Sequence, residues 1–227
     1  YLKGNYRFPK SDKEYKTSFI AAALSQHLQI DKMYIIGTSK SMWEEVYSYF
    51  KEKSGKNLDD EYYTKLASLL WGEGKNGVSV KDLYKVNEAV DSYLKSHYEL
   101  ASGGSECIVI NYGINEEELW ENFDLFMKIS RKIKDGDEIY LDITHSFRSI
   151  SLFMYLMMDF IHTLRGKENI KLAGMYYGML DVSRELGYAP VVDLKPLFEI
   201  TNWTKGIYDF INYGSGYFMA NLTKDED

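Results

Sequence analysis

Apolar residues recur along most of the chain at helical spacing, interrupted by short runs in which nearly every residue is apolar. Spacing of three or four predicts a helix that buries one face, whereas a short apolar run next to a turn is typical of a buried strand. The first pattern predicts helices over 17–28, 41–51, 58–70, 80–94, 119–133 and 150–164. The second predicts strands over 32–36, 106–110, 138–143, 170–177 and 191–194.

This order of strands and helices indicates an α/β fold. Strands separated by helical segments form βαβ units, in which the strands pair in parallel through right-handed crossovers. We therefore expect a mostly parallel sheet sandwiched by helices, with the 150–164 helix buried on most of its surface. Ligands of such sheets bind beyond the carboxyl ends of the strands. That rule directs attention to the segments after Ile36, Ile143 and Tyr177.

Composition and charge narrow the classes of function that the chain can have. The 227 residues are enough for one domain with a substantial core. A net charge of −7 argues against binding long nucleic acid, which needs many phosphate contacts, but a small anion in one basic pocket remains compatible. The single cysteine, Cys107, excludes an intrachain disulfide and a multi-cysteine metal site, and favours a reducing cytoplasm.

Several common signatures are missing from the sequence. The longest apolar stretch, 150–158, is too short to cross a membrane, and no signal peptide pattern occurs, so we expect a cytoplasmic protein. No nucleophile elbow, Walker A loop or HExxH pattern occurs, and we predict no metal site and no cofactor. Gly72-Glu-Gly-Lys-Asn-Gly77 has the spacing of a dinucleotide fingerprint, but it follows a helical segment, so we interpret it as a loop.

The most distinctive segment is Asp142-Ile-Thr-His-Ser-Phe-Arg-Ser149, where a predicted strand passes into a helix. Short hydroxyls, backbone N–H groups and the positive end of the helix can hold a phosphate there. Arg148 adds a permanent charge with a planar set of donors, and His145 can bind ribose or phosphate or assist proton transfer. An alternative explains the residues equally well: a serine caps the helix and Arg148 pairs with a carboxylate.

A second hydroxyl-rich turn between strand and helix is Gly37-Thr-Ser-Lys-Ser-Met-Trp43. Gly37 permits close backbone approach, and Thr38 and Ser39 are candidate ligand hydroxyls. Ser41 and Glu44 have the spacing of a capping box, which favours a capping role for Ser41.

Two weaker candidates lie elsewhere. Gly4-Asn-Tyr6 is predicted to lie in the exit loop of a first strand. Tyr177, at the end of a predicted strand, can stack on a base or pack between sheet and helix.

Together these segments resemble the CRISPR-associated Rossmann-fold (CARF) proteins, the sensor domains of type III CRISPR effectors. Asp142-Ile-Thr-His-Ser-Phe-Arg148 is similar to their DxTHG-type signature, and the strings at 4–6, 37–43 and 175–178 agree in order and spacing. The resemblance extends from Tyr1 to about Trp203. It implies a Rossmann-like homodimer that binds cyclic tetra-adenylate, or next cyclic hexa-adenylate, across its two-fold axis and controls a fused or associated effector.

The resemblance also implies which residues hold the ligand. They belong to four segments: Gly4, Asn5, Tyr6, Gly37, Thr38, Ser39, Ser41, Thr144, His145, Ser146, Phe147, Arg148 and Tyr177. Ser146 stands where the pattern usually has glycine, which adds a side chain at the closest backbone approach. Some relatives cut the ring slowly without metal, so the alternative function is a ring nuclease that uses His145 and Arg148. A third hypothesis is an unrelated regulator whose hydroxyl-rich turns serve only as caps.

The resemblance divides the chain into a sensor domain over 1–203, with its first strand apparently truncated, and a connector over 204–227. Relatives often carry a ribonuclease module in which four to six residues separate an arginine from the histidine that follows it. No histidine of this sequence has an arginine at that spacing. We therefore expect the effector to lie outside these residues.

Overall fold

The computed structural model describes residues 3–72, 77–146, 148–165 and 170–223. Its contacts divide the chain into two compact units. The first unit comprises Tyr1–Ser18 and Ser130–Asp227, and the second comprises Phe19–Ile129. Each unit is described separately.

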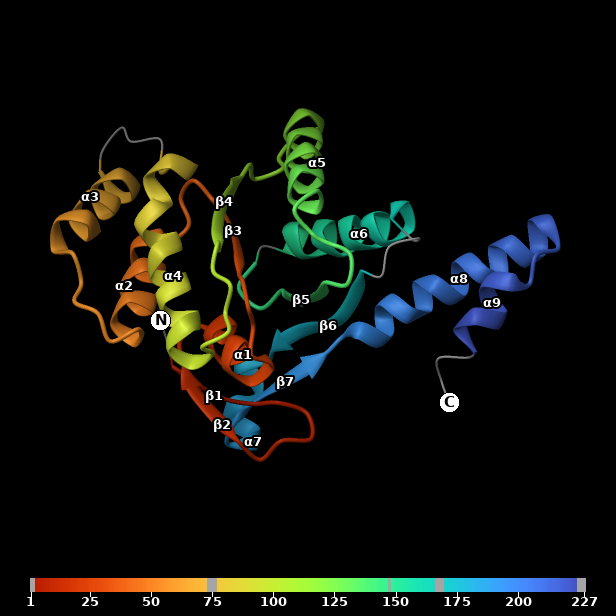
Figure 1. Cartoon of the computed structure of the whole chain (residues 1–227), viewed down its shortest axis with the longest axis horizontal. Helices are drawn as coiled ribbons and strands as arrows, with labels where there is room; N and C mark the ends of the chain where they lie inside the picture. Colours follow the sequence, from red (N-terminus) through yellow and green to blue (C-terminus); the bar gives the residue numbers. More distant parts are fainter. Residues whose placement is uncertain (1–2, 73–76, 147, 166–169, 224–227) are drawn as a thin grey trace. The chain divides into compact units, whose positions relative to one another are not determined.

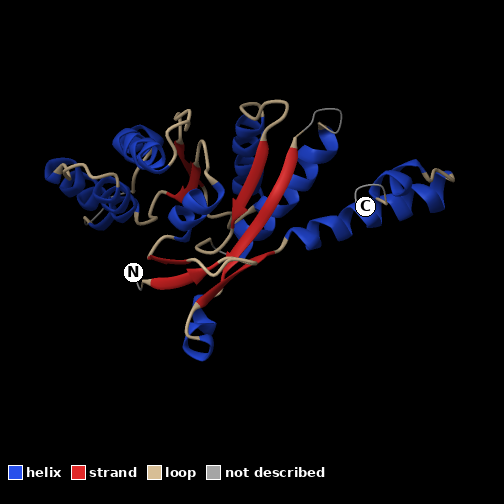
Figure 2. Ribbon diagram, turned by 60° about the horizontal axis from the view of Figure 1, so that its bottom comes forward, coloured by secondary structure: helices blue, strands red, loops and turns tan. Residues whose placement is uncertain are grey.

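A five-stranded sheet forms the centre of the first unit (Figure 2), with the order β2-β1-β7-β6-β5. Its strands are β1 (Gly4–Arg7), β2 (Glu14–Thr17), β5 (Glu138–Asp142), β6 (Lys171–Gly178) and β7 (Ala189–Asp193). β1 pairs in parallel with β7, and β5 with β6, whereas the β1–β2 and β6–β7 pairs are antiparallel. The expectation of an exit loop at Gly4–Tyr6 is therefore wrong, since these residues form β1.

In the sequence, the helices of the first unit come after its strands β5, β6 and β7 (Figure 1). They are α6 (Arg148–Leu164), the 3-10 turn η2 (Leu180–Val182), α7 (Ser183–Leu186), α8 (Lys195–Tyr213) and α9 (Tyr217–Leu222). α6 buries one face through Ile150, Met154, Met157, Met158 and Ile161. Its opposite face is exposed, so the expectation of burial over most of its surface is wrong for the single chain. α8 passes through residue 203 without a break, and the expected division there stays a prediction.

The second unit contains a parallel pair of strands, β3 (Tyr34–Thr38) and β4 (Glu106–Ile110). Its helices are α1 (Ile20–Leu28), α2 (Trp43–Lys53), α3 (Asp60–Trp71), the 3-10 turn η1 (Val80–Leu83), α4 (Tyr84–His97) and α5 (Glu116–Ser130). An aromatic core joins α2, α3 and α4, with Tyr47 edge-on to Tyr62 at 4.8 Å and Phe50 edge-on to Tyr93 at 5.1 Å between ring centroids. Many tyrosines of this chain thus serve packing.

The predicted strands and helices are present with small shifts of their ends, and the α/β class is confirmed. β2 was not predicted. None of the helices in the described ranges is both long and apolar enough to cross a lipid bilayer.

Candidate functional site

Strand ends of the first unit bring three predicted segments to one edge of its sheet. β5 and β6 are parallel and pair up to Asp142 and Tyr176, so both chains leave the sheet at the same edge. β7 starts at that edge because it runs antiparallel to β6, with Gly178 opposite Val191. β1 is parallel to β7, with Tyr6 opposite Ala189, which places Gly4 at this edge as well.

A close approach confirms that the start of β1 lies beside the end of β6. A Cβ atom added to Gly4 would lie 2.8 Å from Leu180 Cδ1, just beyond β6, and 2.8 Å from the Tyr6 ring. A side chain at position 4 therefore has no room. We call this edge, with its residues 4–6, 142–146, 148 and 177–180, the exit edge of the first unit.

The turn after β5 uses its short polar side chains internally. Thr144 Oγ1 accepts a hydrogen bond from the Gly178 backbone N–H at 2.9 Å, and the Thr144 N–H donates to Asp142 Oδ1 at 2.9 Å. Ser146 Oγ donates to the Ile143 carbonyl at 3.1 Å and is hydrogen-bonded to Ser151 Oγ. These hydroxyls hold the turn in shape.

The Asp142 carboxyl lies beneath this turn. Burial raises its pKa above the ordinary value of an aspartate, and hydrogen bonds from the Thr144 side chain and backbone, together with the charge of His145, offset part of that effect. Asp142 was not among the predicted ligand residues. Its position beneath the turn indicates that the Asp142 carboxyl supports the turn.

His145 and Arg148 are the exposed members of the same turn. Arg148 is the first residue of α6, and the ion pairs among the described residues do not include it. The alternative in which Arg148 pairs with a carboxylate is therefore not observed in this part of the chain. Phe147 lies outside the described residues. An exposed guanidinium and an exposed imidazole thus lie at the start of a 17-residue helix.

Residues of β1 differ in what they can offer a ligand. Tyr6 is fully buried, and its hydroxyl has no hydrogen-bond partner within the described residues. Burial and the negative charge of Asp142 raise the Tyr6 pKa. The Asn5 amide donates to Glu14 across the β1–β2 hairpin. In this conformation Tyr6 belongs to the core and Asn5 to the hairpin.

Tyr177 lies near the end of β6 with its side chain 36% exposed, whereas its neighbour Tyr176 is buried. Successive side chains of a strand point to opposite faces of the sheet. Tyr177 therefore offers an accessible ring, which suits stacking on a base.

In the second unit, the turn after β3 is closed by its own side chains. Ser41 Oγ accepts from the Thr38 N–H at 2.9 Å, and the Trp43 indole N–H donates to the Thr38 carbonyl at 2.8 Å. α2 begins at Trp43 without a side-chain cap, and the Glu44 carboxylate accepts from the Trp71 indole N–H at 2.7 Å. The predicted capping box of Ser41 and Glu44 is therefore wrong, because the Ser41 hydroxyl is used to close the turn on Thr38.

The loop with the glycine spacing of a dinucleotide fingerprint packs on this turn. The Val78 N–H donates to the Ser39 carbonyl at 2.9 Å. Gly77 has a φ of +88°, and a Cβ atom there would lie 2.4 Å from the Ser39 oxygen. Gly72 follows α3, as expected, and residues 73–76 lie outside the described residues. Gly77 is thus required by the close approach of two backbones.

One exit loop was missed by the sequence reasoning. β4 ends at Ile110 opposite Thr38, so the loop after β4 leaves the strand pair at the same edge as the turn after β3. This loop is held by α5: Asn122 Oδ1 accepts from the Asn111 N–H at 2.9 Å, and Glu118 Oε2 accepts from the Gly113 N–H at 2.9 Å. It carries the exposed Tyr112. The strand-exit rule, applied after Ile110, would have found it.

A shallow depression of about 500 Å³ lies between the β1–β2 loop and the start of β7. Arg7 lines it, stacked over the Tyr188 ring at 3.9 Å and ion-paired with Glu14. The carboxylate offsets the charge of Arg7. This depression is therefore a weaker anion site than the turn that carries Arg148.

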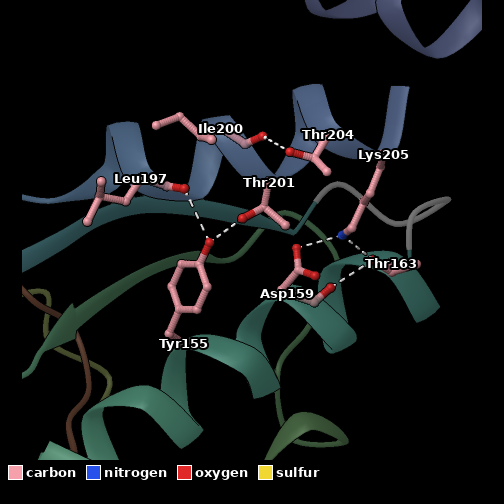
Figure 3. A network of polar contacts seen from close by, with 8 residues as sticks. All are labelled: Tyr155, Asp159, Thr163, Leu197, Ile200, Thr201, Thr204 and Lys205. Atoms are coloured by element: carbon pink, nitrogen blue, oxygen red, sulfur yellow. Dashed lines mark hydrogen bonds and ion pairs between the residues drawn. The ribbon is translucent and has the colours of Figure 1, made fainter. Parts of the chain in front are cut away.

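α6, which starts at the candidate turn, is fixed to α8 by polar contacts (Figure 3). The Tyr155 hydroxyl donates to the Leu197 carbonyl at 3.2 Å and is hydrogen-bonded to Thr201. Lys205 Nζ lies 2.6 Å from Asp159 Oδ1 and 2.7 Å from Thr163 Oγ1. These two groups of contacts, which we call the α6–α8 clamp, connect the helix of the turn to the C-terminal helices.

Known proteins similar to this chain carry CRISPR-related names. Residues 1–179 match the family described as "CRISPR system endoribonuclease Csx1, CARF domain". The chain is 46% identical over 230 residues to the CRISPR-associated protein MJ1674 of Methanocaldococcus jannaschii. That alignment covers 100% of this chain and 36% of the relative, so the chain spans about a third of the length of this curated relative.

Proposed function

Because the chain belongs to the family of Csx1 CARF domains, we propose that it is a sensor that binds a cyclic oligoadenylate and controls an associated effector. Cyclic tetra-adenylate is the favoured ligand and cyclic hexa-adenylate the next. One observation carries the proposal most directly. The turn after β5 exposes His145 and Arg148 at the start of α6, while its hydroxyl groups and carboxylate hold it in place.

The charges in the first turns of α6, α2 and α5 favour the turn after β5, at the start of α6, as the phosphate site. The first turn of α6 contains no acidic residue, whereas the first turn of α2 carries Glu44 and Glu45, and that of α5 carries Glu116, Glu117 and Glu118. A helix N-terminus attracts an anion through its free N–H groups and its dipole, and an acidic first turn opposes that attraction. Arg148 adds its charge at the favourable start.

The exposed face of α6 supports the homodimer. Leu152, Leu156, Phe160 and Leu164 are exposed and follow one another at four-residue spacing, so they form one apolar stripe. The stripe begins one helical turn after Arg148. A two-fold contact along α6 would cover it and bring two copies of the turn towards one ring-shaped ligand.

A thermal-shift series tests the ligand. The protein is heated alone and with cyclic tri-, tetra- or hexa-adenylate, and with linear tetra-adenylate as the control. A ring that binds the folded state raises the melting temperature as its concentration increases, and we expect cyclic tetra-adenylate to have the largest effect. The Arg148→Ala variant should lose most of that effect. Absence of a shift with every ring would contradict the proposal.

The alternative function is a ring nuclease, which the exposure of His145 beside Arg148 favours. In that reaction a ribose 2′-oxygen attacks the adjacent phosphorus, the bond to the 5′-oxygen breaks, and a 2′,3′-cyclic phosphate forms while the 5′-oxygen takes up a proton from water. His145 would accept the 2′-hydroxyl proton and Arg148 would stabilise the charge on the phosphate. Chromatography of the ring after incubation with the wild type and His145→Ala separates the two functions, since a sensor alone leaves the ring intact.

A further inference from the structure

Thr144 connects the exits of two strands. Its hydroxyl oxygen accepts from the Gly178 N–H at 2.9 Å, and its backbone N–H donates to Asp142 Oδ1 at 2.9 Å. A threonine hydroxyl has one donor and two acceptor positions. One acceptor position of the Thr144 hydroxyl is therefore used within the chain.

Gly178 needs this hydroxyl because its neighbouring strand has ended. The β5–β6 pairing reaches Asp142 and Tyr176, and the Ile143 N–H adds one more bond to the Tyr176 carbonyl at 3.1 Å. On that side Gly178 lies beyond the last paired residue, and it is buried. A buried backbone N–H without a partner is costly. The Thr144 side chain thus takes the place of a main-chain acceptor.

We infer that Thr144 is a positioning residue, whose hydroxyl fastens the turn carrying His145 and Arg148 to the β6 end carrying Tyr177, and that it does not contact the ligand. This inference rests on the proposed function, because it concerns the same exit edge. It assigns a different role from the one that the family resemblance implies for Thr144. Two ligand-facing segments, 34 residues apart in sequence, are then held as one surface.

Two substitutions at one position separate shape from hydrogen bonding. Thr144→Val keeps the shape but removes the hydroxyl, whereas Thr144→Ser keeps the hydroxyl. In the free protein we expect the Gly178 amide to exchange faster in Thr144→Val than in the wild type or Thr144→Ser, measured by NMR. Binding of cyclic tetra-adenylate should weaken about tenfold for Thr144→Val, corresponding to one lost hydrogen bond, and Thr144→Ser should restore it.

Thr201→Val is the matched control, because that hydroxyl is also bonded within the first unit but belongs to the α6–α8 clamp. It should change neither Gly178 exchange nor ring binding. If Thr144→Val fails to fold, Asp142→Asn weakens the acceptor of the Thr144 backbone N–H, and it should accelerate Gly178 exchange and weaken binding to a smaller extent.

The outcomes distinguish this inference from the proposed function. Weaker binding by Thr144→Val with unchanged Gly178 exchange would mean a direct ligand contact and would overturn the inference. Wild-type binding by Thr144→Val would overturn it as well. If the wild-type protein binds no ring at all, the proposed function fails, while the exchange of the Gly178 amide still decides whether the hydroxyl forms the bridge.

Discussion

Side chains that look chemically available in the sequence are often hydrogen-bonded inside this protein. Ser41 closes the turn after β3, Thr144 joins two strand exits, and Ser146 bonds to Ile143 and Ser151. At the exit edge the exposed polar side chains among the described residues include His145 and Arg148. At the scale of single residues, exposed polar groups and the hydrogen bonds that shape the turns therefore belong to neighbouring positions.

The single cysteine gives a prediction about reactivity. Cys107 is 2% exposed, and burial raises the pKa of its thiol to about 12. Because the thiolate is the reactive form, we expect the native protein to resist Ellman's reagent, whereas the urea-unfolded chain reacts at once. Absorbance at the wavelength of the released thiolate measures both rates. Fast reaction of the native protein would contradict the buried position of Cys107.

Asp142 gives a prediction about pH. Burial raises its folded-state pKa, so the carboxyl adds stability below the unfolded-state pKa and loses that contribution as the pH rises through the folded-state value. Asparagine does not titrate. The free energy of unfolding of the wild type, minus that of Asp142→Asn, should therefore decrease from about pH 4 to about pH 7. Urea unfolding at several pH values measures it, and a constant difference would contradict the prediction.

At the scale of elements, α6 has three separate roles along its length. Its first turn carries Arg148, its buried face packs through Ile150 and Met157, and its later turns carry the α6–α8 clamp. α8 follows β7 directly and is held at its start by Asp193, whose carboxylate accepts from the Lys195 N–H at 2.9 Å. The clamp holds α8 against α6 together with the buried ring of Phe198, which packs edge-on against Tyr155 and His162.

Removing the clamp should loosen α8. Tyr155→Phe loses the hydroxyl that bonds to Leu197 and Thr201, and we expect the free energy of unfolding to fall by about 1 kcal/mol. Lys205→Met leaves the mostly buried Asp159 unpaired and should cost about 1–2 kcal/mol. Urea unfolding and hydrogen exchange of α8 amides measure these effects.

The control for the clamp is Glu199→Gln. Glu199 pairs with Lys195 at 3.7 Å on the exposed side of the same helix. Such an exposed pair contributes little, so the change should stay below about 0.5 kcal/mol. Equal effects of Glu199→Gln and Lys205→Met would show that the clamp contributes no more than a surface ion pair.

At the scale of the whole molecule, exposed apolar side chains form candidate surfaces for contact with a partner. The α6 stripe of Leu152, Leu156, Phe160 and Leu164 is one such surface, and α8 exposes Ile200, Ile207 and Ile211. Contiguous apolar surface of this kind is uncommon on a monomer. The α6 stripe is the one that starts at the candidate turn, so it is the face assigned to the proposed homodimer.

Changing the stripe should change the oligomeric state. We expect the wild type to sediment as a dimer and Leu156→Glu as a monomer, because a buried unpaired carboxylate at the centre of the contact is costly. Ile207→Glu on α8 and Leu100→Glu in the second unit are matched controls and should remain dimeric. A monomeric wild type, or a dimeric Leu156→Glu, in analytical ultracentrifugation would contradict the assignment.

The sequence by itself determined the helices and most strands, the α/β class and the family, because periodicity and motif strings are properties of neighbouring residues. It did not reveal β1 and β2, whose segments Gly-Asn-Tyr-Arg and Glu-Tyr-Lys-Thr are short and polar. β2 forms by pairing with β1, and β1 also pairs with β7. In the β1–β7 pair, Tyr6 lies opposite Ala189, which is 183 positions later in the sequence.

Only the tertiary structure decided which hydroxyls are structural and which groups remain accessible. The Ser41–Glu44 spacing fits a cap, yet Glu44 bonds to Trp71, and Ser41 closes the turn on Thr38. From the sequence, Thr144 is a candidate ligand residue. In the structure its hydroxyl oxygen accepts a hydrogen bond from the backbone N–H of Gly178, 34 positions later. A hydrogen-bonding group binds whatever the fold brings within about 3 Å, and that neighbour is set by long-range packing rather than by local sequence.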